Sequence, residues 1–288
     1  MPVQSDISHV VREVTVAGGR FAPGHLGELT RIVPFEMVDA ALDQTRAHQR
    51  RLRSIPSRVV VYLLLAAGVI CAWAALHAFA VWHLDAAASP LLAVICLIGL
   101  TWLSVGLFIV AHDAMHGAIM PGRPRINAVI GGLALLLFAG FSWRKLIVKH
   151  MAHHRHAGTD DDPDFGRGGP VTWYAQFVRT YFGWREFWVL GGSVILYALI
   201  LGPRWPYVAF WAVPSILASM QLFVFGTWLP HRPGHDAFPD RHNARSTRLS
   251  DPLSLLTCFH FGGYHHEHHL YPSVPWWRLP STRQEGGA

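Results

Sequence analysis

The sequence predicts an all-α integral membrane protein: four transmembrane helices, a re-entrant or interfacial helical element, and a histidine-rich cap on the cytoplasmic side. Three observations lead to this fold class. The 288 residues are 51% hydrophobic and only 15% charged, whereas a soluble domain carries about a quarter charged residues. Uncharged runs of bilayer length recur along the chain. Nineteen histidines are present, and histidine is costly in a membrane unless it is paired or bound.

Residues 1–58 form the first of two predicted domains, a cytoplasmic or interfacial segment that ends in several arginines. No signal peptide is expected, because the first long apolar run begins late and no cleavage site follows it. Residues 59–288 form the second domain and carry the apolar runs. The basic residues behind the net charge of +6 cluster beside these runs. This placement favours a membrane surface with anionic headgroups as the partner, and not nucleic acid.

Two uncharged runs, Val59–Trp82 and Pro90–Ala111, are each long enough to cross a bilayer of about 30 Å. The link between them contains no Lys or Arg, and arginines precede the first run. The positive-inside rule therefore places the N-terminus in the cytoplasm. A second pair, Phe187–Leu201 and Tyr207–Leu229, is joined by a short Gly-Pro link and predicts the third and fourth spans.

The run Ile126–Trp143 is apolar but borderline in length, and three glycines interrupt it. A full crossing would place the residues after it on the opposite side of the membrane from His112. A re-entrant or interfacial element would keep them on the same side. A single metal cluster needs all the histidine groups on one face, so we predict that this run does not cross. The sequence leaves the choice between re-entrant and interfacial open.

Three histidine clusters lie at the edges of the apolar runs: HDAMH, HMAHH and HHEHH. Residues i, i+3 and i+4 share one face of a helix, so each cluster can aim its imidazoles at a common point. A wet surface patch would explain one such cluster, but not three with a repeated spacing. The aligned residues are His112, His116, His150, His153, His154, His265, His268 and His269, whereas His156 and His266 fall off these faces.

Eight aligned histidines exceed the four ligands of a tetrahedral zinc and favour two metal ions. Nitrogen ligands without thiolates fit Fe, Zn, Cu or Ni, and the three widely separated cysteines predict no disulfide or thiolate site. A bis-histidine haem would need only two imidazoles and leaves the repeated spacing unexplained. His231 is the preferred ninth ligand, with His235, His242 and His260 left open.

These clusters resemble the membrane fatty acid desaturase/hydroxylase superfamily of non-haem di-iron enzymes. More narrowly, HDAMHG, HMAHHRHAGTDDDPDF, FGTWLPHRPGH and HHEHHLYPSVPWWRLP are similar to bacterial beta-carotene ketolases, over His112–Pro280. The resemblance implies a di-iron cap held by the eight aligned histidines, with His231 as an additional ligand. It also implies dioxygen as co-substrate, reduced ferredoxin or a similar protein as electron donor, and a bacterial inner-membrane location.

The same resemblance implies oxidation of beta-carotene at ring carbon 4. The products would be echinenone and canthaxanthin, or astaxanthin from hydroxylated rings such as those of zeaxanthin. Two successive hydroxylations would give a geminal diol, which loses water to form the ketone. The rivals are a carotenoid hydroxylase or an acyl-lipid desaturase of the same superfamily. A membrane metal transporter and a non-catalytic carotenoid-binding protein are further alternatives.

Acidic and aromatic residues beside the clusters complete the predicted site. Metal-bound histidine usually donates its free N–H to a carboxylate or carbonyl, which assigns Asp113, Asp164 and Glu267 to this role. The run Asp160–Asp162 is left open between the same role and a solvated loop. Four aromatic residues are predicted to line a channel for the polyene, against the alternative of an interfacial belt: Trp143, Phe165, Trp276 and Trp277.

Overall fold

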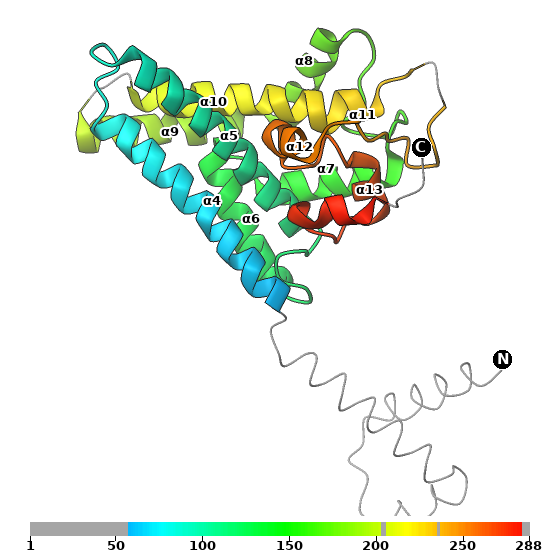
Figure 1. Cartoon of the computed structure of the whole chain (residues 1–288). Coiled ribbons are helices and arrows are strands. Elements are labelled where there is room, and N and C mark those ends of the chain that lie inside the picture. Colours follow the sequence, from blue (N-terminus) through cyan, green and yellow to red (C-terminus); the bar gives the residue numbers. More distant parts are fainter. Residues whose placement is uncertain (1–56, 203–205, 235–236, 284–288) are drawn as a thin grey trace, which may run out of the picture. The chain divides into compact units, whose positions relative to one another are not determined.

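The computed structural model describes residues 57–202, 206–234 and 237–283, and every regular element in these ranges is a helix (Figure 1). The predicted all-α class is therefore confirmed for this part of the chain. Contacts divide the chain into two units, 1–56 and 57–288, so the predicted segment 1–58 lies almost wholly outside the described residues. The elements are α4 (Ser57–Trp82), α5 (Pro90–Met115), α6 (Pro124–Ala139), α7 (Trp143–His156), α8 (Pro170–Tyr181), α9 (Trp184–Leu201), α10 (Pro206–Phe223), η1 (Val224–Trp228), α11 (Leu229–His231), α12 (Asp251–Cys258), α13 (His265–Leu270) and η2 (Trp276–Thr282).

Three helical stretches in the described ranges are long and apolar enough to cross a membrane: Ser57–Trp82, Pro90–Met115 and Val208–His231. They contain most of the predicted first, second and fourth runs. The bent pair of α6 and α7 is a fourth candidate. The predicted third span corresponds to α9, which is not among these candidates and carries Arg185 and Glu186 in its first turn. A count of four spans therefore stays a prediction.

The predicted run Ile126–Trp143 does not form one straight helix. Helix α6 ends at Gly140, whose φ of 69° is the left-handed conformation that glycine adopts without strain. Ser142 then caps α7 by accepting a hydrogen bond from the Lys145 backbone N–H. The two helix axes differ by 101°, the geometry of a broken span or a re-entrant loop.

The bend between α6 and α7 depends on the absence of a side chain at Gly131. A Cβ built there would overlap the ring of Trp143, whereas one at Gly132 would lie 3.8 Å from the Trp143 Cβ. We expect Gly131→Ala to lower the free energy of unfolding by about 1–3 kcal/mol through overpacking. Thermal unfolding in detergent measures this, with Gly132→Ala as the matched control. Equal midpoints for the two variants would show that the close packing of Trp143 is not required.

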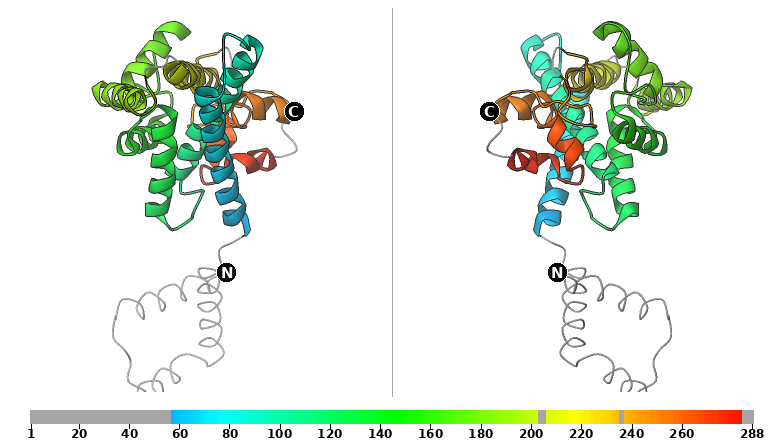
Figure 2. Two further views of the ribbon diagram at one scale, coloured as in Figure 1. Left: turned by 90° about the vertical axis from the view of Figure 1, so that its left-hand side faces the viewer. Right: turned by 90° about the vertical axis from the view of Figure 1, so that its right-hand side faces the viewer.

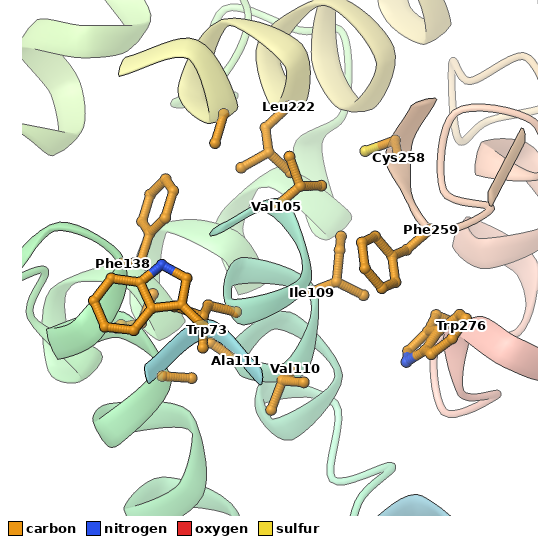
Figure 3. Packing of buried hydrophobic residues seen from close by; sticks show 14 of the residues in the cluster. Trp73, Val105, Ile109, Val110, Ala111, Phe138, Leu222, Cys258, Phe259 and Trp276 are labelled. Atoms are coloured by element: carbon orange, nitrogen blue, oxygen red, sulfur yellow. The ribbon is translucent and has the colours of Figure 1, made fainter. Parts of the chain in front are cut away.

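Helix α5 is the centre of the membrane domain. Half of its most apolar window is buried, against 22% for α4 and 33% for Val208–His231. Figure 3 shows Val105 and Ile109 of α5 between Leu222 of α10 and Phe259 of the C-terminal segment. That segment, orange to red in Figure 2, lies against α5. The ends of distant helices are thereby brought together around the C-terminal half of α5.

One polar contact ties α9 to the membrane core. His77 of α4 is buried and stacks on Trp73, with ring centroids 4.9 Å apart. Its Nδ1 lies 3.2 Å from the Phe210 carbonyl oxygen of α10, and its Nε2 lies 3.1 Å from the Tyr197 hydroxyl of α9. A buried imidazole in a membrane is costly unless it is paired in this way. The contact therefore stabilises the arrangement of α4, α9 and α10.

Candidate metal centre

The nine histidines predicted as ligands lie together, although they come from four separate parts of the chain. They are supplied by the end of α5, by α7, by α11 and by α13. The histidines that come from the same helix share one face of it, as their spacing predicts. One nitrogen of each residue lies within 4.8 Å of the others in its group. The first group is His112, His116, His150, His154 and His268, and the second is His153, His231, His265 and His269.

Pairs of imidazole nitrogens face each other closely in both groups. In the first, the Nε2 atoms of His116 and His150 lie 2.7 Å apart, and those of His154 and His268 lie 3.1 Å apart. In the second, His265 Nε2 lies 2.9 Å from His231 Nε2 and 3.1 Å from His269 Nε2.

The two groups adjoin each other. The ring of His154 from the first group stacks on the ring of His269 from the second, at a centroid distance of 4.3 Å.

The donor set fits two metal ions. Burial, reinforced by the neighbouring imidazoles, lowers the pKa of His265, His268 and His269 well below the usual value, so these rings are neutral. Their Nδ1 atoms are buried and have no hydrogen-bond partner among the residues that the structure describes, while their Nε2 atoms point at other imidazoles. A cation held among the Nε2 atoms would bind their facing lone pairs, and the Nδ1 atoms would then carry the ring protons. Nitrogen ligands without sulfur suit iron, as well as zinc, copper and nickel.

A carboxylate orients His153. Its Nδ1–H donates to Asp162, with 2.9 Å to one oxygen and 3.1 Å to the other, which leaves Nε2 directed at the second group. Burial alone would raise the pKa of Asp162, but hydrogen bonds from His153, Asp164 N–H and Gly158 N–H lower it below the usual value. Asp162 is therefore an ionised acceptor that fixes the His153 tautomer.

Replacing Asp162 with asparagine is expected to weaken metal binding roughly 10- to 100-fold, because the imidazole loses its charged acceptor. Metal retained after dialysis against a graded series of chelator concentrations measures this. Asp161→Asn is the matched control, since Asp161 is the preceding residue in the same loop and is exposed. Equal metal retention in the two variants would remove Asp162 from the site.

Asp113 is held between the first group and the C-terminal segment. It is fully buried and accepts hydrogen bonds from the Tyr62 hydroxyl and, at 2.9 Å, from the Trp276 backbone N–H. Its other oxygen lies 3.4 Å from His112 Nδ1. The carboxylate is thus placed to accept the Nδ1–H of His112 and to anchor η2 beside α5.

Asp164 lies beside the second group. One of its oxygens is 3.8 Å from His153 Nδ1, and the other accepts a hydrogen bond from the Tyr181 hydroxyl. Burial raises the pKa of Asp164, whereas His153 and the Tyr181 bond oppose that rise. Burial also raises the pKa of Tyr181, and the neighbouring carboxylate adds to this effect, so the phenol keeps its proton.

A largely apolar cavity of about 390 Å³ leads to the histidines. Seven of the nine histidines line it: His112, His150, His153, His154, His265, His268 and His269. The remaining wall comes mainly from α5, α6, α8 and α10, and includes Phe108, Phe138, Phe141, Phe177, Trp211 and Phe261. This volume is in the range of ligand sites that bury a small molecule.

Unusual backbone conformations position His231 and the histidines of α13. The π-helical turn η1 interrupts the helix after Phe223, and α11 follows it and ends at His231. Before α13 the chain turns sharply, with Phe259 and His260 in the left-handed region at φ of 48° and 70°. Unusual backbone of this kind occurs often at functional sites. Phe261 emerges from this turn and packs 4.4 Å from the ring of His112.

Comparison with known proteins fits this geometry. A family model described as fatty acid desaturase matches residues 87–194 and 170–286, which together span 87–286 and exceed half of the chain. The chain belongs to the fatty acid desaturase family. A second family model, described as insertion element 4 transposase N-terminal, matches residues 23–86. It covers less than half of the chain and includes the span-length apolar helix α4, so no function is drawn from it.

Several relatives within the desaturase family have named activities. Beta-carotene ketolase of Paracoccus sp. strain N81106 is 75% identical over 78% of this chain and 93% of the relative. Beta-carotene ketolase of Paracoccus sp. strain PC1 is 74% identical over 79% of this chain and 94% of the relative. Zeaxanthin 4-ketolase of Chlamydomonas reinhardtii is 36% identical over 77% of this chain and 53% of that protein.

The predicted role of Glu267, as a hydrogen-bond acceptor for a ligand histidine, requires correction. Its carboxylate accepts hydrogen bonds from the Ser246 hydroxyl and, at 3.0 Å, from Arg283 Nε, and neither donor is a ligand histidine. Residues 265, 268 and 269 share one face of α13, and position 267 lies on the opposite face. Helical geometry alone could therefore have excluded Glu267.

The prediction that four aromatic residues line the substrate channel also requires correction, because none of them lines the cavity. Trp143 packs on Gly131, and Phe165 packs edge-on against Trp173 at 5.2 Å. Trp276 packs on Phe259, and Trp277 lies beside Arg278. Closeness in sequence to a histidine cluster therefore does not place a side chain in the substrate cavity.

The spare histidines have other surroundings in the described ranges. His266 pairs with Asp240 at 2.9 Å, as expected for a residue off the ligand face. His242 and His260 belong to neither histidine group, and His235 lies outside the described residues. Tyr62 and Tyr181 are the site residues that sequence reasoning missed, and Asp162, left open between a role beside the histidines and a solvated loop, bonds to His153. The DDPDF sequence pointed to the right loop, but which of its carboxylates faces His153 depends on the fold.

Proposed function

We propose that this chain is a beta-carotene ketolase, a dioxygen-dependent di-iron oxygenase that converts the ring carbon 4 methylene of beta-carotene to a ketone. Hydroxylated rings, such as those of zeaxanthin, would also be substrates. The observation that carries the proposal is the apolar cavity that ends on two adjoining histidine groups. The 75% identity to a relative named beta-carotene ketolase supports the same proposal. An oxidoreductase of the desaturase family needs such a contact between a lipid-like substrate and a metal centre.

The first histidine group would hold one iron and the second group the other. When bound, the irons supply dioxygen reduction and the cleavage of a C–H bond, chemistry that no side chain provides. The protein's part is to hold the ligands in place. Asp162 and Asp113 do so by fixing the tautomers of His153 and His112. Electrons would come from a reduced ferredoxin-like protein.

The cavity is shaped for a long hydrocarbon. Nine positions of the helix from α10 to η1 line it: Val208, Trp211, Ala212, Ser215, Ile216, Ser219, Leu222, Gly226 and Thr227. They recur at the spacing of one helical face, and the distance from the first to the last is roughly 28 Å at 1.5 Å per residue. A polyene along this face would place its ring against the histidines. Because carbon 4 is allylic, its C–H bond is weaker than that of an ordinary methylene.

The proposed oxidation takes two turnovers at one carbon. Each turnover inserts one oxygen atom of dioxygen into a C–H bond and reduces the other atom to water, with two electrons and two protons supplied. The second hydroxylation gives a geminal diol, which loses one water to leave the ketone. The cavity must therefore hold the ring in one orientation through both turnovers.

The proposed topology has four spans, with the metal centre at the cytoplasmic face of a bacterial inner membrane. His112 and His231 end two span-length helices and belong to adjoining groups. An even number of crossings must therefore separate them, and α10 supplies one. The other crossing must be made by one of the helices from α6 to α9. Helix α9 is best suited, because α6 and α7 are bent by 101° and α9 is tied to α4 through His77.

Expression in cells that accumulate beta-carotene tests the proposed function. We expect a red shift of the pigment and new carotenoids that carry one and two ketone groups by mass spectrometry. With isotopically labelled dioxygen, the 4-hydroxy intermediate should carry the label. Rings hydroxylated only at carbon 3 would identify a carotenoid hydroxylase instead. Unchanged carotenoids together with altered fatty acids would identify an acyl-lipid desaturase.

A further inference from the structure

One buried acid–hydroxyl pair interrupts the apolar cavity at its histidine end. Tyr181 and Asp164 both line the cavity, each is 8% exposed, and the Tyr181 hydroxyl donates to Asp164. Asp164 in turn lies 3.8 Å from His153 of the second histidine group. A hydrocarbon ring has no use for such a pair, and burying polar groups is unfavourable unless they have partners.

Tyr181 is held rigidly at this position. It is the last residue of α8, and Lys145 of α7 donates to its carbonyl oxygen at 2.8 Å. Lys149 donates to the preceding carbonyl, of Thr180, also at 2.8 Å, and its ammonium lies 5.5 Å from the Tyr181 ring. Phe177 packs against the same ring at 5.0 Å. Helix α7, which carries three ligand histidines, thus fixes Tyr181 relative to the metal centre.

The hydrogen-bonding capacity that remains on Tyr181 is selective. Its single proton is committed to Asp164, so toward the cavity its oxygen can only accept. A methylene offers no donor, and a ketone offers only an acceptor. An alcohol and a geminal diol can both donate. Among the species on the proposed reaction path, only the two intermediates can therefore bond to Tyr181.

We propose that Tyr181, oriented by Asp164, retains the alcohol intermediate for the second hydroxylation and lets the ketone leave. This inference rests on the proposed ketolase function. It makes Tyr181 a specificity-determining residue, and it makes Asp164 a positioning residue that acts through Tyr181. The same acceptor would bind the hydroxyl of a ring that is already hydroxylated at carbon 3.

Tyr181→Phe tests the inference, because it removes the hydroxyl and keeps the ring that packs on Phe177. In pigment assays we expect the ratio of 4-hydroxy to 4-keto product to rise about 3- to 10-fold, the effect of one neutral hydrogen bond. The matched control is Tyr264→Phe. The Tyr264 hydroxyl also donates to a carboxylate, that of Asp251, but neither residue lines the cavity. Its ratio should match that of the unmodified protein.

A binding measurement gives a readout independent of turnover. Quenching of tryptophan fluorescence, without reductant, yields dissociation constants for beta-carotene, its 4-hydroxy derivative and its 4-keto derivative. The unmodified protein should prefer the alcohol to the ketone about 3- to 10-fold, and Tyr181→Phe should abolish that preference. Iron content and elution profile show whether the variant is folded. If the variant is not folded, the inference is still tested by whether the unmodified protein binds the alcohol more tightly than the ketone.

The outcomes separate the inference from the proposed function. Ketone formation by the unmodified protein, with equal binding of alcohol and ketone, would overturn the role of Tyr181 and leave the ketolase proposal intact. So would an unchanged product ratio in Tyr181→Phe. No oxidised carotenoid from the unmodified protein would instead contradict the proposed function itself.

Discussion

Replacing His153 with alanine is expected to abolish ketone formation and to lower the iron bound per chain. His153 is the member of the second histidine group that links it to the carboxylates, through Asp162 at 2.9 Å. Its ring also lies 4.7 Å from that of His231 and 5.7 Å from that of His154 in the first group. Loss of a ligand should exceed the effect of losing a residue that only orients one. We therefore expect activity to fall by more than about 100-fold.

Iron analysis of the purified variant and the pigment assay measure this effect together. His156→Ala is the matched control, because His156 lies on the same helix but is exposed and belongs to neither histidine group. The control should keep both its iron and its activity. Retained ketone formation in His153→Ala would contradict the ligand assignment. Lost activity with a full complement of iron would show that His153 acts in another way.

Replacing Ala212 with tryptophan is expected to lower ketone formation about 100-fold or more while leaving the iron content unchanged. Ala212 lines the cavity on α10, almost four helical turns before Gly226 beside the histidines. A tryptophan ring there would fill the far part of the cavity. The polyene could then not slide far enough for its ring to reach the metal centre, and small misplacements at a reacting carbon are costly.

The neighbouring residue provides the control. Val213 is 40% exposed and faces away from the cavity, where the surrounding lipid can accommodate a larger side chain. Val213→Trp should therefore retain activity. A product assay and iron analysis on both variants distinguish a blocked cavity from a damaged fold. Near-normal activity in Ala212→Trp would show that the substrate does not occupy this part of the cavity.

Local features of the chain were predictable from the sequence. Helical spacing within HMAHH and HHEHH identified which imidazoles share a face, and the structure gathers those residues into two groups. The same logic set His156 and His266 apart. Length and apolar character identified three of the span-length helices. In each case the signal lies within one helix, so the geometry of the α-helix is sufficient.

Features that depend on contacts between elements were not predictable. Asp160, Asp161 and Asp162 are equivalent in sequence, yet only Asp162 is buried against His153, because the loop folds back on α7. The residues of the cavity wall were missed for a similar reason. Tyr181 and Trp211 lie far in sequence from the histidine clusters. Only the packing of α8 against α10, and of α10 against α5, brings them to the cavity.

The π-helical turn η1 has a consequence for the phase of the helix. In a regular α-helix, His231 would be rotated by roughly 140° from Gly226, which lines the cavity, because five residues exceed one turn of 3.6. The wider turn at Val224–Trp228 takes up part of that excess, as the bond from Leu229 N–H to the Val224 carbonyl shows. One continuous helix can then line the cavity and also direct an imidazole at the second histidine group. The same residues wound at the regular pitch of 3.6 residues per turn would instead rotate His231 out of register with His265.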